Sequence, residues 1–448
     1  MSKSVITRTK KTRIVIAGGG FVGLTAARYF DHGLARRSDI EVVLISRENF
    51  IVFTPMLHEV AAGDLYPGDI VNPLRRVLHH VKVVEAEVRS IDLSARRIRC
   101  AHGPAQFEIE FEFDRLLLAL GSETNFFNLN GVRELAVTMK NLLDAELLRN
   151  RMVALFEEAM LQSDDATRRQ LLTFVTAGGG FSGTETTGAV NDFVRETAKY
   201  YPDLSEELIR VVIVHPGNFL LPELGEELGR YAERKLIERK VEIFKGTRVT
   251  DYDGALVQLD NGRSIPAATL IWTAGVKPSS VIDSLPLQKE HGRVLVDQFL
   301  RVHGVSEVWA AGDCAAVPDA NTQTFHPPTA QHGLREGLTA AKNIEAAIIG
   351  RPPTPFVFKT MGQLATIGHR TGVAMVLGIK FSGIFAWWLW RTVYLLKLPG
   401  LAKKLRVVIG WTLDLLFGRE IGQLITLRDV ENLSDWLSRS RAREKKPA

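Results

Sequence analysis

Short apolar runs recur along this chain, and segments with helical spacing of apolar residues separate them. The runs occupy residues 13–16, 41–45, 114–120, 172–175, 210–214 and 270–276. A continuous apolar run of this length predicts a strand that is covered on both faces of a parallel sheet. Residues 107–113 alternate instead, which indicates an antiparallel strand. The alternation of strands with helices predicts an α/β fold.

Two glycine-rich phrases follow two of these strands. Residues 17–23 read Ala-Gly-Gly-Gly-Phe-Val-Gly and residues 177–183 read Ala-Gly-Gly-Gly-Phe-Ser-Gly, with six of seven positions identical at a spacing of 160 residues. The first glycine allows a tight turn, the second lets the backbone approach a pyrophosphate, and the third lets the helix pack closely on the strand. One phrase is a weak signal. Two copies, each between a strand and a helix, predict two Rossmann-like dinucleotide-binding domains rather than two unrelated turns.

The strand that follows each phrase normally ends on an acid that binds the adenosine ribose. Here those positions hold Ser46 and His215, and neither an obvious carboxylate nor an arginine for a 2′-phosphate follows His215 directly. Glu48 is close enough in sequence to reach a ribose, although a solvated loop acid explains it equally well. The choice between NADH and NADPH is therefore open at this level.

Composition excludes several classes of protein. Of the 448 residues, 46% are hydrophobic and 24% are charged, as in a globular protein with a large core. Cys100 and Cys314 are the only cysteines, so a disulfide framework and a Cys-x-x-Cys redox pair are both excluded. The net charge of +5 is too dispersed to indicate nucleic acid. Residues 1–11 lack the apolar stretch of a secretory signal, and we expect no metal site.

The C-terminal region combines tryptophan with cations. Four of the seven tryptophans lie within residues 387–411, and the uncharged run 381–390 is half the roughly 20 residues that span a bilayer. Lysine and arginine alternate there with leucine, valine and tryptophan. This mixture predicts helices that lie on an anionic membrane surface, with tryptophan at headgroup depth. A pair of core helices and a dimer interface are the alternatives, and residues 438–448 are expected to be disordered.

Four further motifs identify a family. They are Trp-Thr-Ala-Gly-Val at 272–276, Ala-Ala-Gly-Asp-Cys-Ala at 310–315, Pro-Thr-Ala-Gln at 328–331 and Gly-Gln-Leu-Ala-Thr-Ile-Gly at 362–368. From residue 13 to about 424 the chain resembles the type II NADH dehydrogenases. These are single-chain flavoproteins on one membrane leaflet that pass electrons from NADH to a quinone. The resemblance implies FAD in the first unit, NADH in the second (with NADPH possible), no proton pumping, and attachment to the cytoplasmic face of the cell membrane.

The resemblance also implies roles for individual residues. Gln331 matches a glutamine of the quinone site, but Arg335-Glu336 replaces the two glutamines that usually follow. Arg335 is accordingly a candidate quinone contact. The expected FAD contacts are Gly18, Gly20, Phe21, Gly23, Ser46, Arg47, Thr54, Pro55, Val88, Ala119, Gly121, Gly312, Asp313, Thr329 and Ala330. The expected NAD contacts are Gly178, Gly180, Phe181, Ser182, Gly183, Glu185, Ala274 and Gly275.

Comparison of the two phrases singles out one acid. Two residues after the third glycine, the first copy has Thr25 and the second has Glu185. Because the second helix points toward the flavin in the family, Glu185 is a candidate catalytic residue together with Gln331. It would orient the nicotinamide or relay a proton. The alternative is that an acid simply stabilises the first turn of a helix.

The predicted organisation has five segments. Residues 12–138 form the first part of the FAD unit, 139–170 a helical bridge, 171–287 the NAD(P) unit, 288–350 the second part of the FAD unit, and 351–448 the membrane-surface region. The predicted partners are a quinone and an anionic membrane surface, with a second copy of the chain as a further candidate. Two alternative functions remain, namely a soluble reductase of a small redox protein and a flavin-binding redox sensor.

Overall fold

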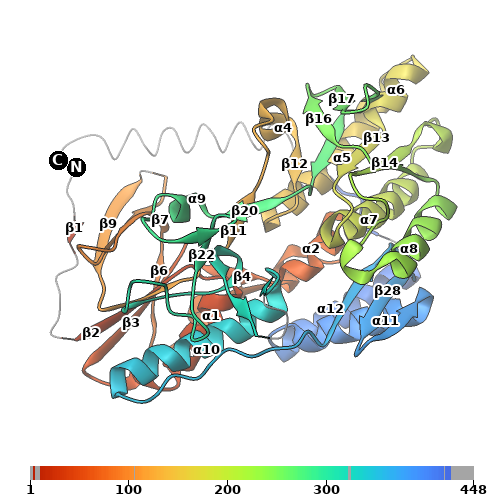
Figure 1. Cartoon of the computed structure of the whole chain (residues 1–448). Helices are drawn as coiled ribbons and strands as arrows, with labels where there is room; N and C mark the ends of the chain where they lie inside the picture. Colours follow the sequence, from red (N-terminus) through yellow and green to blue (C-terminus); the bar gives the residue numbers. More distant parts are fainter. Residues whose placement is uncertain (1–3, 6–10, 105, 321–323, 418, 425–448) are drawn as a thin grey trace.

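The computed structural model describes residues 4–5, 11–104, 106–320, 324–417 and 419–424. Figure 1 shows two α/β units beside each other, with the C-terminal elements (blue) packed against the second unit. The expected disorder of residues 438–448 lies outside the described residues. Among those described, no helix combines the length and the apolar composition needed to cross a membrane.

The first unit is built on a parallel sheet of five strands in the order β23-β10-β2-β3-β6. Its central strands are fully buried, as the apolar runs predict. One strand, β23, follows the strands of the second sheet in the sequence, so the first unit is discontinuous. The bounds are β2 (Thr12–Ala17), β3 (Ile40–Ser46), β6 (Lys82–Glu85), β10 (Arg115–Leu118) and β23 (Val308–Ala310).

Helices α1 (Phe21–Asp31) and α10 (Ala330–Ile349) pack together in the first unit. A small sheet, β1-β9-β8-β7, extends the unit and confirms the antiparallel strand expected at 107–113. Its strands are β1 (Ser4–Val5), β7 (Glu87–Asp92), β8 (Arg97–His102) and β9 (Phe107–Glu112). Smaller elements nearby are β4 (Phe50–Val52), β5 (Val71–Pro73), α3 (Leu74–Val77), α9 (Ser280–Asp283), β21 (Lys289–Glu290), β22 (Arg293–Leu295) and β24 (Ala315–Ala316).

The second unit repeats the plan with the parallel sheet β12-β19-β13-β14-β15. Its strands are β12 (Val137–Thr138), β13 (Thr173–Ala177), β14 (Arg210–His215), β15 (Val241–Lys245) and β19 (Thr269–Trp272). Residues 137–138, which we expected in the first unit, pair with β19 and lie in the second sheet. The helices are α4 (Asn130–Leu135), α5 (Leu142–Met160), α6 (Asp165–Leu171), α7 (Phe181–Ala198) and α8 (Glu226–Glu238).

Two of the segments that connect the units pair with each other. β11 (Ser122–Thr124) and β20 (Val276–Pro278) form an antiparallel ribbon. Beside the second sheet, β17 (Leu256–Leu259) and β18 (Ser264–Pro266) form a hairpin around the turn residues Asp260-Asn261-Gly262, and β16 (Val249–Tyr252) pairs with the other side of β17.

The C-terminal region contains a meander that the sequence did not predict. It consists of β27 (Gly362–Thr366), β28 (Gly372–Val376) and β29 (Ile379–Ser382), followed by α11 (Gly383–Lys397) and α12 (Leu401–Phe417). The meander and α11 share one hydrophobic core with α7 and with α2 (Leu57–Ala61). The region is therefore joined to the second unit by apolar packing.

The prediction that the four tryptophans of residues 387–411 lie at a membrane surface is wrong for three of them. Trp387, Trp390 and Trp411 are buried, and only Trp388, at 64% exposure, faces outward. The Arg391 guanidinium lies between two of the buried rings, 4.1 Å from the centroid of Trp387 and 4.4 Å from that of Trp411. A cation between aromatic faces is stabilised inside a protein as well as at a membrane surface, so this composition does not distinguish the two settings.

Candidate active site

The first glycine phrase forms a turn that only glycine fits. Gly18 has a φ of 115°, and a Cβ atom on it would stand 2.1 Å from the Ala119 carbonyl oxygen. By contrast, a Cβ on Gly20 would meet no atom within 4 Å. Gly20 is the N-cap of α1 and supplies no side-chain cap. The first N–H groups of this helix therefore face open space, which is the arrangement that binds a phosphate.

The turn at Gly312 closes the same cradle from the other side. Its backbone follows β23, where the Ala311 N–H donates to the Leu118 carbonyl. A Cβ on Gly312 would stand 2.7 Å from Cγ2 of Val22, and a Cβ on Gly337 would stand 2.5 Å from the Val22 carbonyl oxygen. Glycines thus let the Gly312 turn and α10 approach α1. This contact places the N-terminus of α10 at the cradle.

Asp313 follows that turn and is held by side chains near the crossing ribbon. The Ser122 hydroxyl donates to Asp313 Oδ2, and Lys140 Nζ donates to the same hydroxyl at 2.7 Å. Lys140 Nζ also lies 4.0 Å from Asp313 Oδ2. The carboxylate is therefore oriented from the segment that joins the two units.

The remaining expected FAD residues lie in several environments. Ser46 is buried at the end of β3, and its Oγ stands 2.3 Å from where Gly19 would carry a Cβ. Phe21 packs edge-on against Phe53, next to Thr54 and Pro55. Gly121 follows β10 beside Ala119, and Thr329 is an N-cap of α10 without a side-chain cap. Arg47 is exposed and pairs with Glu48, and Val88 is a core residue of β7.

The second cradle reproduces the first. Gly178 has a φ of 110°, and a Cβ on it would stand 2.7 Å from the Thr273 carbonyl oxygen. A Cβ on Gly183 would stand 1.8 Å from the Gly178 carbonyl oxygen, which explains the third glycine. Gly180 is the N-cap residue of α7, and no side chain caps the first N–H groups of this helix. Ala274 and Gly275 follow β19 directly beside this turn, and Phe181 and Ser182 form its first helical residues.

Glu185 is the fifth residue of α7, just beyond a first turn that holds no acid, and it points into the C-terminal region. Its Oε1 accepts hydrogen bonds from the Thr366 N–H at 3.2 Å and from Trp390 Nε1 at 3.1 Å. His58 of α2 completes the group, with Nδ1 3.9 Å from Glu185 Oε2 and Nε2 3.0 Å from Thr366 Oγ1. Three parts of the chain that are remote in sequence therefore meet at this carboxyl.

Burial governs the charges in this cluster. Burial raises the pKa of Glu185 to about 8, although both hydrogen bonds oppose the rise. Burial lowers the pKa of His58 to about 3. At neutral pH the carboxyl is therefore mostly protonated and the imidazole is neutral. A carboxyl whose pKa lies near the working pH suits acid–base chemistry better than a purely structural role.

The expected quinone residues lie at the start of α10. Gln331 Nε2 donates to the Gly362 carbonyl at 3.4 Å, and Arg335 donates to the Gln331 carbonyl at 2.8 Å while its guanidinium covers the Phe358 ring at 4.1 Å. Glu336 points elsewhere. Its Oε2 accepts the Gly312 N–H at 2.7 Å, and burial raises its pKa to about 7. Glu336 therefore belongs to the first cradle, which sequence reasoning missed.

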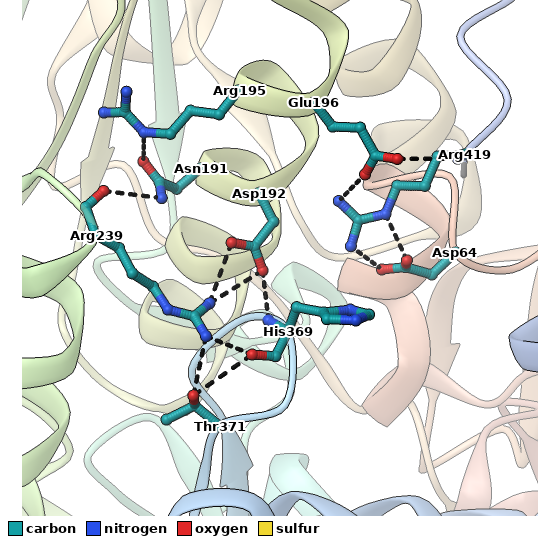
Figure 2. A network of polar contacts seen from close by, with 9 residues as sticks. All are labelled: Asp64, Asn191, Asp192, Arg195, Glu196, Arg239, His369, Thr371 and Arg419. Carbon is teal, nitrogen blue, oxygen red and sulfur yellow. Dashed lines mark hydrogen bonds and ion pairs between the residues drawn. The ribbon is translucent and has the colours of Figure 1, made fainter. Parts of the chain in front are cut away.

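A polar network fixes the C-terminal region against α7 (Figure 2). Asp192 accepts from the His369 N–H and from Arg239, which also donates to the His369 carbonyl. Farther along the helix, Glu196 and Asp64 hold Arg419. A charged cavity of about 530 Å³ borders these groups. The network explains how the meander that carries Thr366 is kept in register with Glu185.

The two thiols take no part in this site. Cys100 and Cys314 are both buried and free. Burial raises the pKa of Cys100 to about 12 and that of Cys314 to about 11. Because the thiolate is the reactive form, neither group serves as a redox nucleophile.

Comparison with known proteins agrees with this geometry. Residues 12–337 match the model of the pyridine nucleotide-disulphide oxidoreductase family, and residues 361–420 match that of the NDH2 C-terminal domain. The type II NADH:quinone oxidoreductase Ndh of Mycobacterium tuberculosis is 32% identical over 438 residues, covering 94% of this chain and 91% of that protein. The chain belongs to the type II NADH:quinone oxidoreductases.

Other members and neighbours extend the comparison. A probable NADH dehydrogenase of Dictyostelium discoideum is 30% identical over 438 residues, 94% of each chain. The structure of NDH2 from Plasmodium falciparum in complex with NADH superposes with a TM-score of 0.85 at 21% identity, covering 92% of this chain and 100% of that one. The sulfide:quinone oxidoreductase of Aquifex aeolicus shares the fold, with a TM-score of 0.68 at 16% identity and coverages of 91% and 96%.

Within this type II oxidoreductase, the sequence predicted the two glycine turns and singled out Glu185 as a candidate, but it did not predict the groups that surround Glu185. Thr366 and Trp390 lie 181 and 205 residues away from it. Only the motif at 362–368 signalled the first of them. Trp390 was assigned to the membrane face because its neighbours are apolar and basic.

Proposed function

We propose that this chain oxidises NADH and reduces a quinone at a membrane surface, using bound FAD. The observation that carries the proposal is the pair of uncapped glycine cradles whose surroundings meet at Glu185. When bound, FAD supplies the redox chemistry, because it accepts a hydride from reduced nicotinamide and passes electrons on. The protein supplies binding, orientation and proton management.

The residues present fit both dinucleotides. In the first cradle the uncapped N–H groups of α1, with the Gly312 turn and the start of α10, suit the pyrophosphate of FAD. Asp313, oriented by Ser122, is placed to accept hydrogen bonds from hydroxyl groups. In the second cradle the start of α7 and the Gly275 turn suit the pyrophosphate of NADH. A Cβ on Gly20 would meet no atom within 4 Å and one on Gly180 would meet only Glu223 Oε1, at 3.6 Å, so the backbone of both turns is open to the phosphates.

Glu185 is our candidate for the acid–base group. It sits one turn from the second cradle, is buried, and bridges to the C-terminal region through Thr366 and Trp390. We assign it the orientation of the nicotinamide and the relay of a proton. Gln331 and Arg335, at the start of α10, are the candidate contacts of the quinone headgroup. Arg335 would donate to a quinone carbonyl in place of the usual amide.

The outer face of α11 and α12 is the candidate membrane contact. Its exposed apolar side chains include Phe385, Trp388, Leu405, Ile409 and Phe417, with exposures of 59%, 64%, 56%, 57% and 78%. So many large apolar side chains exposed on two helices in contact are unusual on a soluble monomer. Since no described helix can cross a bilayer, the face would lie on one leaflet, which we place on the cytoplasmic side of the cell membrane.

A vesicle flotation assay tests the membrane contact. The double variant Trp388→Ser, Ile409→Ser should weaken binding to phosphatidylglycerol vesicles by at least about tenfold, because each buried apolar side chain contributes roughly 1.5–3 kcal/mol. Leu161, 84% exposed at the end of α5, provides the matched control Leu161→Ser. If the double variant floats like wild type, the face does not bind lipid. Dimers that dissociate in the double variant would assign it to a second copy instead.

Turnover tests the reaction itself. Purified FAD-bound protein should consume NADH in step with menaquinone or ubiquinone analogues. Failure to reduce any quinone, with transfer to a small redox protein instead, would favour a soluble reductase. Tight FAD without turnover would favour a redox sensor.

A further inference from the structure

The second cradle lacks an acid where a dinucleotide fold normally places one. β14 ends at His215, and this ring is turned inward rather than toward a ligand. Its Nδ1 accepts the Gly179 N–H at 3.1 Å. A Cβ on Gly179 would stand 2.7 Å from the ring, and a Cβ on Gly217 would stand 2.6 Å from Nε2. His215 is therefore packed between two glycines beneath the phrase.

The loop after His215 returns to the glycine phrase and is fixed there. The Leu221 N–H donates to the Gly179 carbonyl at 2.8 Å, and the Leu220 N–H donates to Glu233 Oε1 at 3.2 Å. Leu221 adopts a left-handed φ of 52° to make this bend. A non-glycine residue in that conformation is held by its surroundings, so the short helix that follows, Pro222–Leu224, has a defined position.

Glu223 of that short helix lies over the second cradle. Its Oε1 stands 3.6 Å from where Gly180 would carry a Cβ, and no other atom lies within 4 Å of that point. Within the described part of the chain, no hydrogen bond or salt bridge holds this exposed carboxylate. Its charge acts on His215, opposing the burial that lowers the pKa of that ring. Residues 215–229 contain no lysine or arginine.

These observations place an unpaired carboxylate beside the phosphate turn, next to the strand end where the adenosine ribose of a dinucleotide lies. We propose that Glu223, rather than the residue at the end of β14, recognises the 2′ position of that ribose. The carboxylate accepts hydrogen bonds from a free 2′-hydroxyl and repels a 2′-phosphate. The second cradle thus selects NADH over NADPH. This inference rests on the proposed function, since it assumes that the cradle binds a dinucleotide.

Calorimetry on the FAD-bound full chain tests the assignment without turnover. The probes are ADP-ribose and its 2′-phosphorylated form. Wild type should bind ADP-ribose at least about tenfold more tightly. Glu223→Arg should strengthen binding of the phosphorylated probe by about tenfold or more, because reversing one charge next to a dianion replaces repulsion with attraction. Glu223→Gln keeps the shape of the side chain but removes its charge. It should shift the ratio of the two affinities in the same direction as Glu223→Arg, but by a smaller factor.

Glu226 provides the matched control. It lies three residues farther on and pairs with Arg230 at 3.0 Å, so Glu226→Arg reverses a nearby charge outside the cradle. It should leave the ratio of the two affinities unchanged. An unchanged ratio in both Glu223 variants would overturn the inference while leaving the NADH cradle intact. If neither probe binds to wild type, the proposed NADH site and the inference fail together.

Discussion

Replacing Glu185 by glutamine separates chemistry from stability. Burial in the folded protein raises the pKa of this carboxyl from its ordinary value of 4.5 to about 8. A group whose pKa is raised on folding retains its proton in the folded state while the unfolded chain releases it. Wild type should therefore lose about 1.4 kcal/mol of unfolding free energy per pH unit between pH 5 and 8 from this group. Glu185→Gln removes that slope.

Two measurements follow from this variant. Chemical denaturation at pH 6 and pH 8 should show a smaller loss of stability in Glu185→Gln than in wild type, by about 2 kcal/mol. Turnover should fall by about 10²-fold with FAD retained, because a general acid–base group is lost. The inflection near pH 8 in the rate profile should disappear as well. Equal pH slopes of stability in both proteins would refute the reasoning that Glu185 is buried and protonated.

Glu59 supplies the matched control for this experiment. It is also buried, accepts a hydrogen bond from Trp411 Nε1 at 2.9 Å, and has a pKa raised to about 7 by burial. Glu59 faces the Arg391 sandwich rather than the start of α7. Glu59→Gln should change stability with pH and keep the inflection in the rate profile, moved to lower pH because the Glu59 charge helps to raise the pKa of Glu185. Loss of that inflection in Glu59→Gln would move the acid–base role away from Glu185.

Three further changes test neighbouring parts of the site. Gly180→Ala should weaken NADH binding by about tenfold at nearly unchanged stability, because its Cβ enters the cradle and lies at an ordinary contact distance of 3.6 Å from Glu223 Oε1. Gly183→Ala should destabilise the fold, because its Cβ would stand 1.8 Å from the Gly178 carbonyl oxygen. Calorimetry and thermal melts distinguish the two variants. Glu336→Gln should keep FAD but raise the flavin midpoint potential by about 30 mV above pH 7. Below pH 7 the potential should not change, because the Glu336 carboxyl is already protonated and uncharged there. Spectroelectrochemistry at pH 6 and pH 8.5 checks this. Trp390→Phe removes a hydrogen bond that lowers the pKa of Glu185. The pKa of Glu185 should therefore rise, and the alkaline limb of the pH–rate profile should move to higher pH.

The sequence predicted the two cradles well because their physics is local. Glycine turns, buried strands and the helices that follow them are determined by a few adjacent residues. The short meander at 362–382 was missed because its strands are four or five residues long, and only β29 alternates apolar with polar residues. The partners of Glu185 were missed because Thr366 and Trp390 are brought to it only by folding.

The tryptophan cluster shows a different limit. Tryptophan with arginine on an apolar helix predicts a membrane surface, yet Arg391 stacks between two buried rings. Both settings favour the same residue types because both combine an apolar surface with a cation near aromatic faces. The solvent exposure of the tryptophan rings distinguishes the two settings, and that exposure depends on how the helices pack in the folded chain. Glu336 is a similar case. Its position next to the quinone motif suggested a quinone contact, whereas its carboxyl accepts a hydrogen bond from the Gly312 N–H.

Single-turnover reduction followed by quinone addition tests the central claim most directly. FAD-bound protein mixed with one equivalent of NADH should bleach at the flavin absorption band, and adding a quinone analogue should restore that band with one quinol formed per NADH. In Glu185→Gln the same steps should occur with slower kinetics. Bleaching that a quinone does not reverse, in vesicles or in detergent, would contradict the account.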